Sequence, residues 1–232
     1  DDKVFYNAMR DLLKFTPKKI LFYQKAFTHR SLKKIDEKGK PFNYERLEFL
    51  GDAMLGSVIA SYLYKKVPNE SEGYLTQMRS KIVSREHLNE LGKDLNLITF
   101  VKSNISKNNI GDNIHGNIFE ALIGAIYLDR GYNYCNTFIY DKVIIPYVDI
   151  PKLEGKITSY KGLIIEWCQK QKKKYHIETY EDTGNEPVKH FSVKISIDGV
   201  QIAKGRATSK KKAEEQASKR VYFTFQKLIE NS

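Results

Sequence analysis

The sequence of 232 residues has few cysteines and no long apolar run. Its two cysteines, Cys135 and Cys168, lie far apart with no histidine near either at metal-ligand spacing. This excludes a disulfide framework and a zinc site, and it fits a reducing compartment. No stretch approaches the roughly 20 apolar residues of a membrane-spanning helix, and the N-terminus lacks the basic-then-apolar order of a signal peptide. We therefore expect a cytoplasmic protein with no membrane partner.

Acidic residues are too few to balance the basic ones. The chain holds 39 Lys and Arg against 28 Asp and Glu, a formal net charge of +11. Residues 151–232 alone hold 17 basic against 10 acidic residues, so the smaller C-terminal part is the more basic. This excess predicts a polyanionic partner, either nucleic acid or an anionic membrane surface. With 41% hydrophobic residues, the chain can still fill one large or two modest cores.

The spacing of apolar residues changes along the chain. Through residues 44–64, 75–91 and 118–127 they recur every three or four positions, which is typical of helices. Two prolines and a glycine then cluster between positions 146 and 155. We predict an all-α helical bundle over residues 1–149 and a linker over residues 150–156.

Alternating patterns dominate the C-terminal part, residues 157–230. Turn signals at 183–185 and at Asp198-Gly199, a hairpin dipeptide, separate three short alternating stretches. We predict an α+β domain of α-β-β-β-α order, with a helix at 157–173, strands at 175–180, 191–197 and 200–207, and a helix from about Ser209.

Three carboxylates share one face of the helix predicted near residue 50. They are Glu45, Glu48 and Asp52, at positions i, i+3 and i+7. The face expected to turn toward the core carries Leu47, Leu50 and Met54. Stacked like charges repel each other, and a divalent cation would remove that penalty. For this helix taken alone, a solvated acidic face is the alternative interpretation.

A second segment, residues 116–127, is nearly all apolar but contains Glu120. A carboxylate on a buried helix lacks a water shell, which is costly. The position becomes favourable if Glu120 faces Glu48 and Asp52 across a shared Mg²⁺, with Asn117 one turn earlier as a neutral oxygen ligand. Carboxylate-rich oxygen sites suit Mg²⁺ or Mn²⁺.

These segments carry a family resemblance. Residues 45–52, Glu-Arg-Leu-Glu-Phe-Leu-Gly-Asp, resemble the signature motif of the ribonuclease III family, and residues 119–125 resemble its second acidic motif. Residues 26–31 are similar to the family's early helix, and the resemblance continues through the C-terminal part. It implies a metal-dependent, homodimeric endonuclease that cuts double-stranded RNA, leaves 5′-phosphate and 3′-hydroxyl ends, and uses no small-molecule cofactor. Processing of ribosomal and other RNA is the usual family role.

Carried over by position, the resemblance places the family's metal-binding carboxylates on Glu48, Asp52 and Glu120 and its accessory acidic residues on Glu45 and Glu72. Glu72 fits equally well as an ordinary first residue of a helix. Asn117 stands where the commonest family pattern has Asp, so it offers a carbonyl oxygen without a charge. We expect a working enzyme because the other acidic positions are intact. The alternative is a non-cleaving double-stranded RNA-binding protein that uses the nuclease fold as a dimerisation scaffold.

One acidic cluster faces one strand, whereas a duplex has two. A two-fold homodimer would place a second, identical cluster across the same duplex. The resemblance implies that Phe49 inserts into the partner subunit at this interface. Packing of Phe49 in its own core is the alternative.

The C-terminal part resembles a double-stranded RNA-binding domain. A serine can cap the last helix, whose N-terminal amides suit a phosphate, and the lysines after it would reach phosphates across the major groove. In the family, the first helix and the loop before the second strand touch the minor groove. A solvated helix face is the alternative for the lysine run, and Trp167 is expected in the core. The candidate RNA-binding residues are Lys161, Glu166, His190, Ser209, Lys210 and Lys211.

Overall fold

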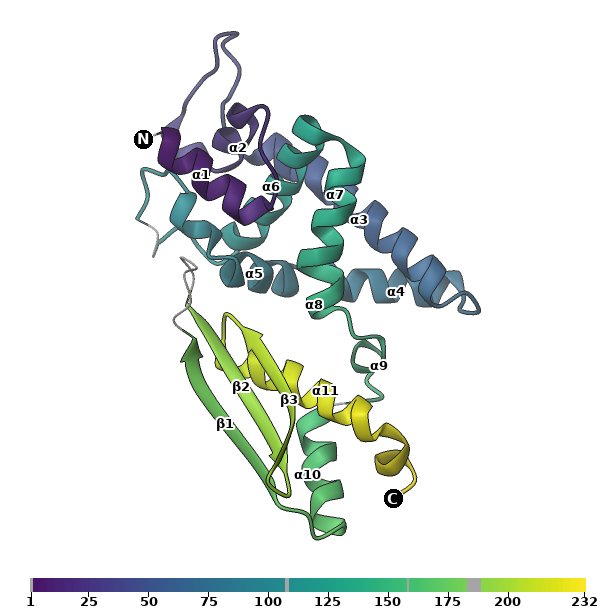
Figure 1. The fold of residues 1–232 in the computed structure, drawn as a ribbon. Helices are drawn as coiled ribbons and strands as arrows, with labels where there is room; N and C mark the ends of the chain where they lie inside the picture. Colours follow the sequence, from purple (N-terminus) through teal and green to yellow (C-terminus); the bar gives the residue numbers. More distant parts are fainter. Residues whose placement is uncertain (1, 107–108, 158, 183–188) are drawn as a thin grey trace. The chain divides into compact units, whose positions relative to one another are not determined.

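The computed structural model describes residues 2–106, 109–157, 159–182 and 189–232. It forms two compact units, Asp1–Asp149 and Ile150–Ser232. In Figure 1 the first unit consists of helices and the second holds the sheet. Within the described residues, no helix combines the length and the apolarity that crossing a membrane requires.

The first unit is all helical, as the sequence predicts. Its α-helices are α1 (Asp2–Leu13), α2 (Ile20–Ala26), α3 (Glu45–Lys66), α4 (Glu72–Ile82), α5 (Arg85–Asp94), α6 (Ile114–Arg130), α7 (Tyr132–Ile139) and α8 (Ile145–Tyr147). Short 3₁₀ turns lie at Arg30–Leu32 and Leu97–Phe100, and a π-helical segment spans Tyr140–Ile144. Helix α6 is the centre of this unit, because ten of its residues are buried.

The periodic stretch 75–91 is two helices rather than one. The Ser84 hydroxyl accepts a hydrogen bond from the His87 amide at 3.3 Å, and Ser71 caps the preceding helix in the same way from the Tyr74 amide. A serine at the N-cap position satisfies an amide that a new helix leaves open. Apolar spacing alone misses such a break, since the core face continues across it.

Helices α3 and α6 pack so closely that their backbones touch. A Cβ built on Gly51 of α3 would lie 1.7 Å from the Glu120 carbonyl oxygen of α6. A Cβ on Gly124 of α6 would lie 2.2 Å from the Leu47 carbonyl oxygen of α3. Real Cβ atoms do not approach oxygen this closely, so the crossing requires both glycines.

This crossing corrects the core face predicted for α3. The buried positions are Leu47, Gly51 and Leu55, whereas Leu50 and Met54 are only half-buried. The apolar pattern favours the larger side chains, but the backbone of α6 lies against the glycine stripe. The acidic face of α3 is therefore turned beside α6 rather than directly away from it.

The second unit is an α+β domain of the predicted order. It contains the short helix α9 (Ile150–Leu153), then α10 (Tyr160–Lys170), β1 (Tyr175–Asp182), β2 (His190–Ile197), β3 (Val200–Ala207) and α11 (Lys210–Glu230). The three antiparallel strands lie in the order β1-β2-β3. Helices α10 and α11 pack on the face that carries Val193, Ile195 and Ala203, and they form one core with it.

Two connecting segments of this unit, the hairpin and the linker, compare differently with the sequence predictions. The hairpin at Asp198-Gly199 is as predicted, with positive φ angles of 52° and 81° at its two residues. The segment 150–156 is not a plain linker, because α9 occupies its first four residues and the Glu154 amide donates to the Ile150 carbonyl. The turn predicted at 183–185 lies outside the described residues.

The α3–α6 crossing predicts opposite effects for two alanine substitutions on one helix. Gly51→Ala should destabilise the protein by about 2 kcal/mol or more, because overpacking forces the helices apart. Gly56→Ala should stabilise it by about 0.5–1 kcal/mol, since nothing lies within 4 Å of a Cβ there and alanine favours helix. Thermal unfolding measures both, and a Gly51→Ala protein as stable as the parent would contradict the crossing.

Candidate metal centre

Four of the five carboxylates predicted from the sequence, Glu45, Glu48, Asp52 and Glu120, line one cavity of about 590 Å³. Helices α3, α5 and α6 form its walls, and Val83 lies in the connection between α4 and α5. Its lining residues are Glu45, Glu48, Phe49, Asp52, Val83, Arg85, Leu88, Asn89, Gly116, Asn117 and Glu120. The fold thus brings residues from three separate segments of the chain to one place.

Glu72 is the one predicted acidic residue that does not line this cavity. It is the exposed first residue of α4, and its carboxylate accepts a hydrogen bond from the Thr76 hydroxyl at 2.7 Å. Within this chain it acts as an ordinary helix-start glutamate, where a negative charge is favourable.

Glu120 is the most perturbed carboxyl group of the cavity. Burial, the negative charges of Asp52 and Glu48, and a hydrogen bond with the Asp52 carboxylate together raise its pKa to about 8. The positive charge of Arg85 partly offsets this. These surroundings therefore favour the protonated form of Glu120 near neutral pH.

Glu48 has the same type of environment in a weaker form. Burial is the largest cause that raises the pKa of Glu48, followed by the charge of Glu45, and Asp52 adds to it. Arg85 and Arg30 act in the opposite direction. The cavity therefore brings acidic groups together with only partial compensation from Arg85 and Arg30, which disfavours their charged forms.

Asn117 lies in the cavity one turn before Glu120, as predicted. Its side chain forms a hydrogen bond with the phenol of Tyr44, a buried residue next to the start of α3. This bond lowers the pKa of Tyr44, although burial raises it by more. Tyr44 therefore helps to fix the Asn117 side chain in the lining of the cavity.

The donor set suits a hard divalent cation. It consists of carboxylate oxygens and the side-chain amides of Asn89 and Asn117, with no sulfur or imidazole in the lining. In the part of the chain that the structure describes, however, no three His, Cys, Asp or Glu side chains stand at the spacing that holds one metal ion. Asp52 and Glu120 meet in a hydrogen bond, whereas convergence of Glu48 with them on one ion stays a prediction.

The sequence argument missed Arg85. It is the exposed first residue of α5. Its side chain lines the cavity and carries the charge opposite to that of the carboxylates. Periodicity cannot find such a residue, because its position depends on how α5 packs against α6. A basic residue directly after a capping serine was the only signal available.

Phe49 is exposed rather than packed in its own core. Its exposed fraction is 81%, although it lies between buried and half-buried neighbours on α3 and borders the cavity. An aromatic ring of this exposure is costly in water and typical of a contact surface.

The start of α11 carries the serine and the lysines that the sequence analysis assigns to phosphate binding. The Ser209 hydroxyl accepts a hydrogen bond from the Lys212 amide at 3.3 Å, and Lys210 and Lys211 are exposed in the first turn. The Lys210 ammonium also lies 5.6 Å from the Phe191 ring centre. The remaining amides of the first turn are open to an anion.

The other RNA-binding candidates are engaged within the unit. Lys161 pairs with Glu214 of α11, and Glu166 pairs with Lys170 at 3.3 Å. His190 is the first residue of β2, opposite Asp182. Trp167 is 3% exposed and stacks on Phe225 at 5.1 Å between ring centres, which confirms its place in the core.

Comparison with known proteins identifies both units. Residues 19–147 match the family model of a ribonuclease-III-like domain, and residues 160–222 match that of a double-stranded RNA binding motif. The chain belongs to the ribonuclease III family. The order of the two matches follows the ribonuclease III pattern expected from the sequence.

Relatives match over nearly the whole chain. A Ribonuclease 3 of Zunongwangia profunda is 68% identical over 96% of this chain and 91% of its own length. A Ribonuclease 3 of Flavobacterium psychrophilum is 62% identical over 99% of this chain and 94% of its own length. Among solved structures, the nuclease domain of ribonuclease III from Campylobacter jejuni covers 62% of this chain and 97% of its own, with a TM-score of 0.54 and 28% identity.

The raised pKa of Glu120 predicts that the protein loses stability as pH rises. The folded state keeps this proton up to about pH 8, whereas the unfolded chain releases it near pH 4.5. Because the folded state binds more protons in between, the free energy of unfolding should fall across this range. Urea unfolding in the presence of a chelator measures it. Glu120→Gln should flatten the pH dependence, and equal slopes for the two proteins would contradict this environment.

Proposed function

We propose that the chain is a divalent-cation-dependent endonuclease that cuts double-stranded RNA as a homodimer. The observation that carries this proposal is the cavity that Glu48, Asp52 and Glu120 line together. In this cavity the pKa of the Glu120 carboxyl group is raised to about 8. Such a cluster is unfavourable for the fold by itself, and it becomes favourable with a cation bound. Membership of the ribonuclease III family supports the reaction class.

The residues of the cavity would have different roles in binding the cation. Glu48, Asp52 and Glu120 would hold the cation through carboxylate oxygens, and Asn117 would add a carbonyl oxygen that Tyr44 orients. Glu120, whose pKa is raised to about 8, must release its proton before it can bind the cation as an anion. When bound, Mg²⁺ or Mn²⁺ supplies an activated water and stabilises charge on the phosphate. Products would carry 5′-phosphate and 3′-hydroxyl ends.

Two further carboxylates have supporting roles in this proposal. Glu45 lies at the exposed edge of the cavity and pairs with Arg30 at 3.3 Å, so it can assist placement of the substrate. Glu72 lines no part of the cavity of its own chain. We keep it as an accessory residue on the strength of the family pattern alone.

The RNA-binding unit holds the substrate by its shape. Ser209, Lys210 and Lys211 would bind phosphates at the start of α11, where helix amides and two ammonium groups meet. Lys161, Glu166 and His190 would face the minor groove. Lys161 can do so only while sharing its charge with Glu214.

Two cuts in one duplex require two cavities, which a two-fold dimer supplies. The exposed Phe49 at the border of the cavity supports an interface at this end of α3. Another structure of the Campylobacter jejuni nuclease domain, with a TM-score of 0.53, is described as having a region involved in dimer formation. The fitting cellular role is ribosomal and other RNA processing in the cytoplasm.

Cleavage of a defined RNA duplex tests the proposal. The protein should cut it with Mg²⁺ or Mn²⁺ and stop when a chelator is added. Glu120→Gln should lower the cleavage rate by about a thousandfold, equivalent to about 4 kcal/mol of transition-state stabilisation, and should still bind the duplex. Glu70→Gln, an exposed glutamate outside the cavity, is the matched control and should cut normally.

Asn117 provides the discriminating variant against a non-cleaving scaffold, because it is the only neutral residue among the predicted metal ligands. For a working enzyme, Asn117→Asp should change the cation concentration needed for half-maximal cleavage without being required for activity. A parent protein that binds the duplex and never cuts it, together with an Asn117→Asp variant that does, would contradict the proposal.

The dimer has its own test. Phe49→Asp should convert the protein to monomers in sedimentation, because a charge replaces the exposed ring at the proposed interface. The matched control is Tyr64→Asp, which places a charge at another exposed aromatic of α3, near its far end. A Phe49→Asp protein that stays dimeric would refute this placement of the interface.

A further inference from the structure

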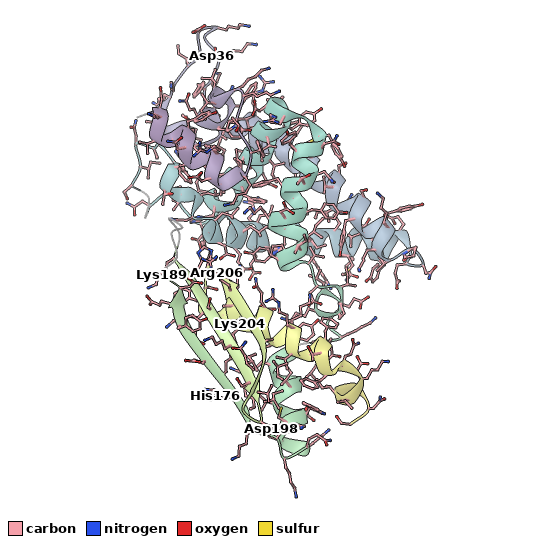
Figure 2. All side chains as sticks on the ribbon, viewed as in Figure 1. Asp36, His176, Lys189, Asp198, Lys204 and Arg206 are labelled. Carbon is pink, nitrogen blue, oxygen red and sulfur yellow. The ribbon has the colours of Figure 1, made fainter. Side chains whose placement is uncertain are left out.

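The segment before α3 is a small, rigid hairpin. Residues 33–41 fold back on themselves, with a bridge between Ile35 and Pro41. The Asp36 amide donates to the Lys40 carbonyl at 2.8 Å, and the Gly39 amide donates to the Asp36 carbonyl at 2.9 Å. Figure 2 labels Asp36 in this hairpin, which projects from the body of the helical unit.

Asp36 uses its negative charge inside the hairpin. Its carboxylate accepts the backbone amides of Lys38 and Lys40, each at 2.9 Å. These bonds fix the backbone of the turn that carries the exposed Lys38 and Lys40. The base is equally fixed, because the Phe42 amide donates to the Lys34 carbonyl at 2.8 Å and the Phe42 ring is buried.

The hairpin carries four exposed lysines against two acidic residues. They are Lys33, Lys34, Lys38 and Lys40, and none of them makes an ion pair with a carboxylate in the described ranges of the chain. Lys34 and Lys25 lie over the Phe42 ring, at 4.4 Å and 5.8 Å from its centre. Four lysines against two acidic residues give the hairpin a net charge of +2, which attracts an anionic partner.

The hairpin ends directly before α3, the helix that carries Glu45 and other residues of the cavity. The Tyr44 amide donates to the Thr28 carbonyl at 3.1 Å, which fixes the end of the hairpin segment at the start of α3. Lys40 and Glu45 are five residues apart, so their Cα atoms lie within about 18 Å of each other. This distance is comparable to the length of a few nucleotides along a duplex strand.

We infer that the hairpin 33–41 is an RNA-contact surface of the helical unit, which binds the phosphate backbone of the duplex a few nucleotides from the cleavage cavity. The inference rests on the proposed function, because the partner it names is the duplex that the proposal assigns as substrate. The contact is electrostatic and independent of base sequence. It places a second group of phosphate contacts on the unit that carries the cavity, in addition to those at the start of α11.

The test compares two pairs of lysines in the full chain. Lys38→Gln with Lys40→Gln removes two cations from the hairpin. Lys65→Gln with Lys66→Gln removes two exposed cations at the far end of α3, about 30 Å from Glu45, and leaves the same net charge. Duplex affinity is titrated at several salt concentrations in a Glu120→Gln background, so that the RNA stays intact.

The hairpin pair should weaken duplex binding by about three- to tenfold and reduce the slope of log K against log salt concentration by about two. The α3 pair should change neither. In the protein with Glu120 restored, the hairpin pair should raise KM with kcat unchanged, because it removes uniform binding. Unchanged thermal unfolding shows that both pairs leave the fold intact.

Each contrary result has a separate meaning. If the hairpin pair binds with parental affinity and slope, or if both pairs lose affinity equally, the hairpin is not an RNA contact and the inference is wrong. If the parent protein never cuts the duplex, the proposed function fails, and the binding titration still decides the role of the hairpin.

Discussion

The backbone contact between α3 and α6 determines where the charged groups of the helical unit lie. Gly51 and Gly124 each face a carbonyl oxygen of the opposite helix at a distance that no Cβ tolerates. This approach brings Asp52 into hydrogen-bond contact with Glu120, and it turns Glu48 into the same cavity. A looser crossing would separate the carboxylates and lower the pKa of Glu120 toward its ordinary value. The packing of two helices and the chemistry of the cavity are therefore one feature of the fold.

The charges of the cavity illustrate how a site can oppose the stability of its own fold. Burial and mutual repulsion raise the pKa values of Glu120 and Glu48, and Arg85 compensates only partly. An ordinary core would replace these groups with apolar ones. The presence of these carboxylates on helices that are otherwise well packed is the physical argument for a bound cation. The same argument favours a polyanionic substrate, which the cation would help to bind. The exposed lysines at the start of α11 carry the positive charge that complements such a substrate.

Much of this organisation could be predicted from residues alone. The spacing of Glu45, Glu48 and Asp52 gave one face of a helix, and the apolar surroundings of Glu120 indicated a partner for its charge. Three features escaped because the spacing of apolar residues does not report them. The core face of α3 follows the glycines rather than Leu50 and Met54, Arg85 enters the cavity through the placement of α5, and the break before α5 comes from the Ser84 cap. The hairpin is a similar case, since its lysines gain meaning only from the hydrogen bonds that fix Asp36.

The central claim is that residues far apart in the sequence hold one divalent cation across the α3–α6 crossing. A crystal structure with Mn²⁺, analysed by anomalous scattering, measures this most directly. We predict one strong peak in the cavity, bound at about 2.1–2.3 Å by carboxylate oxygens of Glu48, Asp52 and Glu120. A saturating Mn²⁺ concentration that gives no peak there, or a peak bound by other residues, would contradict the account.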